Sequence, residues 1–314
     1  MENRTIRIVV SCSSRKKLNA PDDLKINNYQ GNLEQKIKEW DKRLSTPVTQ
    51  QYPAVDMYQG GHWSIARKIH GFVSNENSNI ELWIASAGYG LIRADTLIES
   101  YAATFSRGFS DSVNGDSKTL WWDLLSSRQR LSPSNLTALV ENNPDDFLVV
   151  ALSDTYLKAL EKDLLGVTNL LTREKFLLIS ASVGKEQSDL SCFHVSADAR
   201  LVNKLGGNLI SLNARVVLHL LEKESLHKWK RNKIDKYFYE LTESQLPFKR
   251  LKRKKLTDEQ IVSFITQQIN ETAGQKKESV LSHTQLLRRL REAGHACEQT
   301  RFRKIFEETM LSRS

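Results

Sequence analysis

"IRIVVSCSSRKKLNAP", residues 6–21, begins as a short, mostly β-branched run and changes character at Ser11. Small hydroxyl residues and a thiol follow the run, and then come three consecutive cations, Arg15, Lys16 and Lys17. An apolar run of this length is typical of a strand that is covered on both faces. The segment therefore predicts a buried strand that ends in a turn of small residues with cations beside it.

Three further short apolar runs follow, at residues 80–85, 147–152 and 175–180. Apolar residues recur at three- and four-residue spacing in other segments, which we expect to be helices: 34–44, 62–74, 133–143, 154–166, 196–207 and 212–225. Strands that alternate with helices predict an α/β fold, with an open parallel sheet flanked by helices and joined by right-handed crossovers. Residues 106–132, which contain "WWDLL", predict an irregular insertion.

The excess positive charge lies in one segment. Residues 1–222 hold 25 Lys and Arg against 25 Asp and Glu, residues 223–255 hold 12 against 4, and residues 256–314 hold 9 against 8. The middle segment also contains Trp229, Tyr237, Phe238, Tyr239 and Phe248. Cations interleaved with aromatic rings are typical of a surface that binds nucleic acid, although a solvated linker is the alternative.

The last segment has the signals of three helices. Thr257 and Gln260 form a capping box before "DEQIVSFITQQINE", Ser282 caps "HTQLLRRLREA", and Gly294 precedes "CEQTRFRKIFEETM". Two helices joined by a short turn that contains Gly predict a helix-turn-helix, with an ordinary helical hairpin as the alternative. We therefore predict three parts: an α/β nucleotide-binding domain at 1–222, a basic aromatic linker at 223–255 and a helical, nucleic-acid-binding domain at 256–314.

Each predicted strand is followed by Ser and other small residues: "SCSSRKK", "SAGYGLIRADTLIESY", "SDTYLKAL" and "SASVGKEQSDLSCFH". Each Ser could cap a helix, but the four exits meet at one edge of a parallel sheet, where ligands bind. Together with Arg15, Lys16 and Lys185 they predict a crevice for a phosphate or a nucleotide.

Familiar cofactor and metal motifs are absent from the sequence. It contains no G-x-x-x-x-G-K-[ST] loop, no G-x-G-x-x-G after a strand, no H-E-x-x-H and no G-x-S-x-G, so we expect neither a cofactor nor a metal. Three widely spaced cysteines predict a reducing, cytoplasmic setting, and the start of the chain does not resemble a signal peptide. No apolar run has the roughly 20 residues of a membrane helix.

Carboxylates follow the second and third strands. Asp95 and Glu99 come after the second strand, and Asp154 comes after the third, where it could also cap a helix. A hydrolase without a metal needs one carboxylate to orient water. Cys12 stands among cations that favour a thiolate, but no base adjoins it in the sequence.

The segments "SCSSRKK", "SAGYGLIRADTLIESY" and "LSDTYLKAL" resemble a group of prokaryotic proteins with a uracil-DNA-glycosylase-like α/β fold. Relatives in this group include the modified-base domain of archaeosine synthase, and some members are associated with phage defence and with removal of modified bases from phage DNA. The resemblance covers about residues 6–220. It implies that the ligand pocket is lined by Ser11, Ser13, Arg15, Lys16, Gly88, Tyr89, Gly90, Asp95, Tyr101, Asp154 and Tyr156, and we add Ser182 from the fourth exit.

The sequence departs from the classical glycosylases at two places. The first exit has no water-activating carboxylate, and "SASVGK" has neither His nor Pro. The catalytic group is therefore expected to be Asp95 or Asp154.

We predict a metal-independent DNA glycosylase that flips a modified base out of the duplex, with a nucleotide-sensing regulator or a tRNA base-modifying enzyme as alternatives. The DNA contacts are expected at Lys228, Lys230, Arg231, Lys249, Arg250, Lys252, Arg253, Gln299, Arg303 and Lys304.

Overall fold

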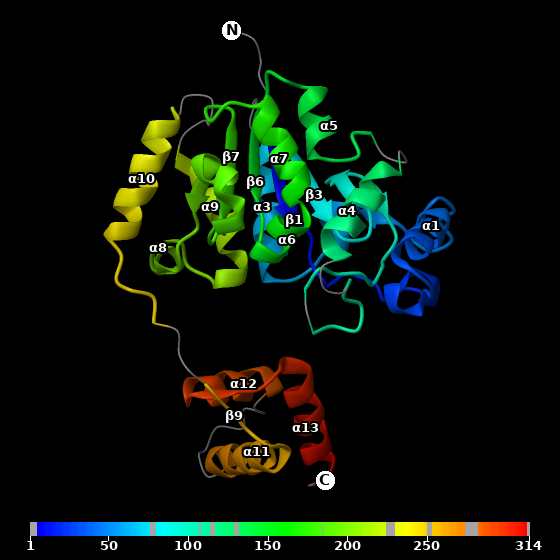
Figure 1. The fold of residues 1–314 in the computed structure, drawn as a ribbon. Coiled ribbons are helices and arrows are strands. Elements are labelled where there is room, and N and C mark those ends of the chain that lie inside the picture. The colour runs from blue at the N-terminus through cyan, green and yellow to red at the C-terminus, as the bar shows by residue number, and fades with distance from the viewer. Residues whose placement is uncertain are drawn as a thin grey trace. The chain divides into compact units, whose positions relative to one another are not determined.

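The computed structural model describes residues 5–75, 80–106, 108–113, 117–128, 132–183, 185–223, 230–249, 253–273 and 282–312. The chain divides into two compact units, Met1–Phe248 and Lys249–Ser314 (Figure 1). We describe each unit by itself.

A mixed sheet forms the centre of the first unit. Six strands of the described residues belong to it, in the order β4-β3-β1-β6-β7-β8. Their bounds are Ile6–Ser11 (β1), Ile80–Ser86 (β3), Gly90–Arg93 (β4), Phe147–Ala151 (β6), Phe176–Ser180 (β7) and His194–Ser196 (β8). The prediction of an α/β fold is confirmed, but the sheet is not wholly parallel. The turn at 87–89 reverses the chain, so β4 runs antiparallel to β3 as an edge strand.

Helices cover both faces of this sheet (Figure 1). One face carries α3 (Gly61–Asn75) and α9 (Leu212–Lys223), which pack on each other and on the strands. The other face carries α4 (Ser117–Ser127), α5 (Leu136–Glu141), α6 (Asp154–Ala159) and α7 (Glu161–Leu170). The remaining elements are α1 (Leu33–Leu44), α2 (Ala54–Met57), α8 (Val202–Leu205), the pair β2 (Tyr52–Pro53) and β5 (Leu97–Ile98), and five 3₁₀ turns at Asp22–Leu24, Ile26–Asn28, Lys185–Phe193, Ala199–Leu201 and Leu209–Ser211.

The helix α4 corrects the prediction of an irregular insertion at 106–132. Its "WWDLL" segment buries Trp121, Trp122 and Leu125 against the core. The indole nitrogen of Trp121 donates to the backbone oxygen of Ala87, and that of Trp122 donates to Asp163. These tertiary contacts stabilise a helix whose sequence has little amphipathic pattern of its own.

The helix α10 (Arg231–Glu243) corrects the predicted linker at 223–255. It buries Ile234 and Phe238 in the core of the first unit, and the boundary between the units lies at residue 248. The guanidinium of Arg231 is also buried, where it donates to the backbone oxygens of Phe176, Phe193 and His194. Packing against the sheet therefore explains Arg231 and Phe238, whereas Lys230, Tyr239 and Lys249 are exposed.

Three helices and a short strand pair form the second unit. The helices are α11 (Asp258–Ala273), α12 (His283–Glu292) and α13 (Gln299–Leu311), and β9 (Lys254–Lys255) pairs in parallel with β10 (His295–Ala296). The capping box predicted at Thr257 is present, and the predicted cap at Ser282 is a capping box with Gln285. The core of this unit includes Ile261, Leu286 and Phe302. None of the described helices in either unit combines the length and the apolar composition needed to cross a membrane.

Candidate functional site

The order of the parallel strands places a switch point between β1 and β6. The chain leaves β1 for β3 on one side, and it then forms β6, β7 and β8 in succession on the other side. Ligands of open α/β sheets bind beyond the carboxyl ends of the strands at such a point. A cleft of about 810 Å³ lies there, lined by residues that follow β1, β6, β7 and β8.

The first exit supplies one wall of the cleft through Ser11, Cys12, Ser13 and Ser14. The hydroxyl of Ser13 donates to the backbone oxygen of Gln59 and accepts from the backbone N–H of Arg15, which fixes the turn. Arg15 itself is exposed and does not line the cleft. Of the residues predicted at this exit, Ser11 and Ser13 are therefore at the cleft.

Lys16 is not where a phosphate contact was expected. Its Nζ is buried without a hydrogen-bond partner among the described residues and lies 3.9 Å from the centre of the Tyr101 ring. The backbone holds it there, since Lys16 bridges to Tyr58 and the N–H of Lys17 donates to the oxygen of Met57. Burial lowers the pKa of Lys16, opposed in part by the charges of Cys12 and Asp111. The side chain of Lys185, the other predicted cation, lies outside the described residues.

Buried hydroxyls connect the cleft with the second exit. The Sγ of Cys12 lies 2.9 Å from the hydroxyl of Tyr156 and 3.4 Å from that of Tyr101. Behind them, the hydroxyl of Tyr101 lies 2.8 Å from that of Ser86 and 2.9 Å from that of Tyr58. Burial raises the pKa of all three tyrosines well above the ordinary value, so they stay protonated.

The predicted residues Gly88, Tyr89 and Gly90 do not line the cleft, and the first two pack against Tyr101. A Cβ on Gly88 would lie 2.5 Å from ring atoms of Tyr101. Gly90 has a φ of +77°, which favours glycine where the chain turns into β4. The hydroxyl of Tyr89 accepts from the N–H of Glu99 and fixes the segment that leads to Tyr101.

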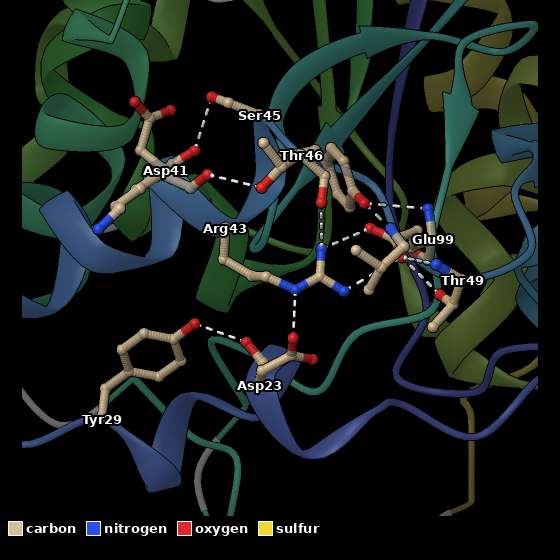
Figure 2. Close-up of polar contacts among 11 residues, drawn as sticks. Asp23, Tyr29, Asp41, Arg43, Ser45, Thr46, Thr49 and Glu99 are labelled. Carbon is tan, nitrogen blue, oxygen red and sulfur yellow. Dashed lines mark hydrogen bonds and ion pairs between the residues drawn. The ribbon is translucent and has the colours of Figure 1, made fainter.

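The two carboxylates of the second exit also lie away from the cleft. Asp95 follows β4, and its ion pair with Arg93, which also pairs with Glu81, places it beside the amino-terminal half of β3. Figure 2 shows Glu99 between Arg43 and Thr49. Its carboxylate accepts from the guanidinium of Arg43, the N–H groups of Val48 and Thr49, and the Thr49 hydroxyl. These donors outweigh burial and lower the pKa of Glu99 to about 2. The prediction of Asp95 as a catalytic group at this cleft is therefore wrong.

The third exit brings Asp154 and Tyr156 to the cleft. Asp154 is the first residue of α6, after the N-cap Ser153, and is exposed. Its carboxylate has no hydrogen bond or ion pair with another described residue. Of the predicted carboxylates, Asp154 is the one available to a ligand or to water. At the fourth exit Ala181 lines the cleft, whereas Ser182 is exposed beside it and accepts from the Ser180 hydroxyl through its backbone oxygen.

Two titratable residues of the cleft, His62 and Asp198, were not predicted from the sequence. The Nε2 of His62 lies 3.0 Å from the backbone oxygen of Ser11, whereas its Nδ1 is buried without a partner among the described residues. Burial lowers the pKa of His62, which favours a neutral ring that donates through Nε2. Asp198 is paired with Arg200, and their hydrogen bonds lower its pKa. The only sequence signal for His62 is its position beside two glycines at the start of α3.

The predicted DNA contacts differ in accessibility. Lys230, Lys249, Arg253, Gln299, Arg303 and Lys304 are exposed, whereas Arg231 is buried in the first unit and is excluded as a surface contact. On α13, Arg303 and Lys304 pair with Glu307 and Glu308 one turn later. Lys228, Arg250 and Lys252 lie outside the described residues.

The described residues contain no group of three or more His, Cys, Asp or Glu side chains placed to hold a metal ion. Comparison with protein-family models, with curated proteins and with solved structures finds no match to this chain.

Proposed function

We propose that the first unit is a DNA glycosylase, which hydrolyses the N-glycosidic bond of a modified base such as those of phage DNA, and that the second unit holds the DNA. The observation that carries this proposal is the carboxylate of Asp154 in the cleft at the β1/β6 switch point, which has no hydrogen bond or ion pair with another residue of the described ranges. A carboxylate without competing partners can orient a water molecule toward the sugar carbon.

The size and lining of the cleft suit a nucleotide that has left its duplex. A volume of about 810 Å³ is within the range of small-molecule sites, roughly 300–1,000 Å³. Hydroxyls of the first and third exits offer donors and acceptors to a base edge. Three exposed apolar side chains, Phe109, Leu209 and Ile210, also line it. Apolar side chains in such a position stack on a flipped base or fill the space that it leaves in the duplex.

The charge of the second unit favours a polyanionic partner. Residues 249–314 contain 15 Lys and Arg against 8 Asp and Glu, whereas residues 1–248 contain 31 against 29. Lys254 and Lys255 are exposed on β9, and α12 adds the exposed Arg288 and Arg289. Because Arg303 and Lys304 of α13 and Arg288 of α12 each pair with a glutamate one turn later, we expect Lys254, Lys255 and Arg289 to contribute most of the phosphate contacts.

The test is base release from three DNA substrates: unmodified, uracil-containing and phage-modified. Freed bases are identified by mass spectrometry, and strands are cleaved with alkali. Asp154→Asn should slow base release about 10²–10⁴-fold because water loses its orienting carboxylate. Asp95→Asn is the matched control and should leave the rate unchanged, since Asp95 is at the other end of the sheet.

Two results would overturn the proposal. One is the absence of base release from every DNA in the panel, and the other is an Asp154→Asn variant as active as the parent. If no base is released but DNA affinity changes when nucleotides are added, the cleft is that of a sensor.

A further inference from the structure

The Sγ of Cys12 has an environment that the proposed role of Asp154 does not use. Cys12 lines the cleft, and its sulfur is within hydrogen-bond distance of two tyrosine hydroxyls, those of Tyr101 and Tyr156. A buried structural thiol packs against apolar groups, whereas this one faces hydroxyls on one side and the cleft on another.

The hydrogen bonds among the hydroxyls behind the sulfur of Cys12 can be assigned an order of donor and acceptor. Ser86 accepts from the backbone N–H groups of Gly88 and Tyr89 and from the hydroxyl of Tyr58. Its own proton is therefore left for the oxygen of Tyr101, and Tyr101 in turn donates to Sγ. A chain of donors that ends on sulfur stabilises negative charge there.

A base also lies beside this cluster. The Nζ of Lys16 is buried, has no hydrogen-bond partner among the described residues, and lies over the ring of Tyr101, whose hydroxyl is bonded to Cys12. An unpartnered buried amine is costly unless it serves a partner that carries charge for part of the time. Nζ makes no hydrogen bond to Sγ, so the thiol proton passes to this amine through a water molecule. The thiol then becomes a thiolate near an ammonium, and the two charges stabilise each other.

We propose that Cys12 is the nucleophile of the cleft, that Lys16 is the base that activates it, and that its target is the sugar carbon C1′ of the flipped nucleotide. The substrate class rests on the proposed glycosylase function, but the activated thiol does not. Other charged or titratable groups that face the cluster are Tyr58, Tyr101, Tyr156, Asp111 and His62.

The reaction has two displacements. Lys16 takes the thiol proton, and the thiolate attacks C1′, so that a C1′–S bond forms while the C1′–N bond breaks. The electron pair of that bond leaves with the base, which takes a proton from water. A second water, held by Asp154, then attacks C1′: a C1′–O bond forms, the C1′–S bond breaks, and sulfur keeps the electron pair. The proton of this water passes through Asp154 to solvent, where it neutralises the hydroxide left by the first water. The ammonium of Lys16 returns its proton to sulfur, which restores the thiol and the amine, so the sum is hydrolysis.

The first test probes the thiol without DNA. The full chain is treated with iodoacetamide, and alkylation of Cys12 is followed by peptide mass spectrometry, with the exposed Cys192 of the same chain as internal standard. Lys16→Met should slow alkylation of Cys12 about tenfold or more while Cys192 reacts at its former rate. An unchanged Cys12 rate in Lys16→Met would overturn the assignment of Lys16 as the base.

The second test uses a DNA from which the parent protein releases a base. Cys12→Ser keeps a hydrogen-bonding group of similar size, so it should fold, yet base release should fall on the order of 10³-fold or more. In Asp154→Asn the second displacement is blocked, so one base per protein should be released and the intact mass should rise by that of the abasic strand. Full activity of Cys12→Ser, or no adduct in Asp154→Asn, would overturn the nucleophile. If the parent protein releases no base, the glycosylase function is contradicted. The iodoacetamide test then still shows whether Lys16 activates the thiol of Cys12.

Discussion

The exits of β3 and β6 have similar sequences but opposite environments. Each contains a Ser, a Tyr and a carboxylate, although the carboxylate follows the Tyr at the β3 exit and precedes it at the β6 exit. At the β3 exit, Ser86, Tyr89 and Glu99 all have their hydrogen bonds within the protein. At the β6 exit, Ser153 makes no side-chain capping bond, and Asp154 is exposed in the cleft. The same residue types therefore serve as scaffold in one place and as available ligand groups in the other.

The two exits differ in whether their polar side chains are hydrogen-bonded within the protein. Glu99 accepts from an arginine, two N–H groups and a hydroxyl, and its side chain is only 1% exposed, so it is closed to water. A carboxylate without partners keeps all of its acceptor capacity. Because this difference depends on residues far away in the chain, such as Arg43 and Thr49 around Glu99, it cannot be recognised from the exits alone.

The largest predicted difference in stability is between substitutions of the two acidic residues of the β3 exit, Glu99 and Asp95. Glu99→Ala should lower the free energy of unfolding by about 3–5 kcal/mol, because Arg43 loses its buried partner and keeps only the more exposed Asp23, while the N–H groups of Val48 and Thr49 lose their acceptor. Asp95→Ala should change it by less than about 0.5 kcal/mol, since Asp95 is exposed. Urea unfolding followed by tryptophan fluorescence measures both, because all six tryptophans precede residue 249 and report on the first unit. Equal effects would contradict the distinction.

Acid should weaken the same site. The pKa of Glu99 is lowered from 4.5 to about 2, so the carboxylate stabilises the fold fully above pH 4.5, and this contribution is lost as the pH falls toward 2. The difference corresponds to about 3 kcal/mol. Unfolding free energies measured across this range should show the loss in the parent protein. Glu99→Gln should show a shallower dependence by that amount, and an identical slope in the two proteins would refute the assignment.

Much of the fold could be predicted from the sequence, because strands and amphipathic helices have local periodicity. The runs at 6–10, 80–85 and 147–152 are strands as expected. The antiparallel β4 and the helix α4 were missed, since a three-residue turn and tertiary burial of tryptophans determine them. The segment at 231–243 was misread because Arg231 and Phe238 have the composition of a nucleic-acid surface, whereas burial against β7 and β8 is a long-range effect.

The site could be predicted only in part. The chemistry of parallel strand ends places Ser11, Ser13, Asp154 and Tyr156 at the cleft. The sequence could not show that Lys16 folds back over Tyr101, because a cation after a strand is more commonly a surface group. Nor could it show that Tyr101, 89 residues from Cys12, would reach its sulfur.

Gly88 tests whether the scaffold behind Tyr101 is tightly packed. Gly88→Ala places a methyl group 2.5 Å from two ring atoms, so the ring must move, at a cost of about 3 kcal/mol. Gly71→Ala in α3 is the control: a Cβ there meets nothing within 4 Å, and alanine should stabilise the helix by about 0.5–1 kcal/mol. Unfolding in urea gives both values, and a neutral Gly88→Ala would mean that Tyr101 is not held in place.

The smallest expected change in stability is that of substituting Ser153, the serine of the β6 exit. Ser86→Ala leaves the buried N–H groups of Gly88 and Tyr89 without an acceptor and should cost about 1–3 kcal/mol. Ser153→Ala removes a hydroxyl that makes no capping bond, so it should change stability by less than about 0.5 kcal/mol. If Ser153 instead contributes as much as a typical N-cap, about 1 kcal/mol, its hydroxyl is part of the scaffold. The β6 exit would then be less open to a ligand than its unpartnered carboxylate indicates.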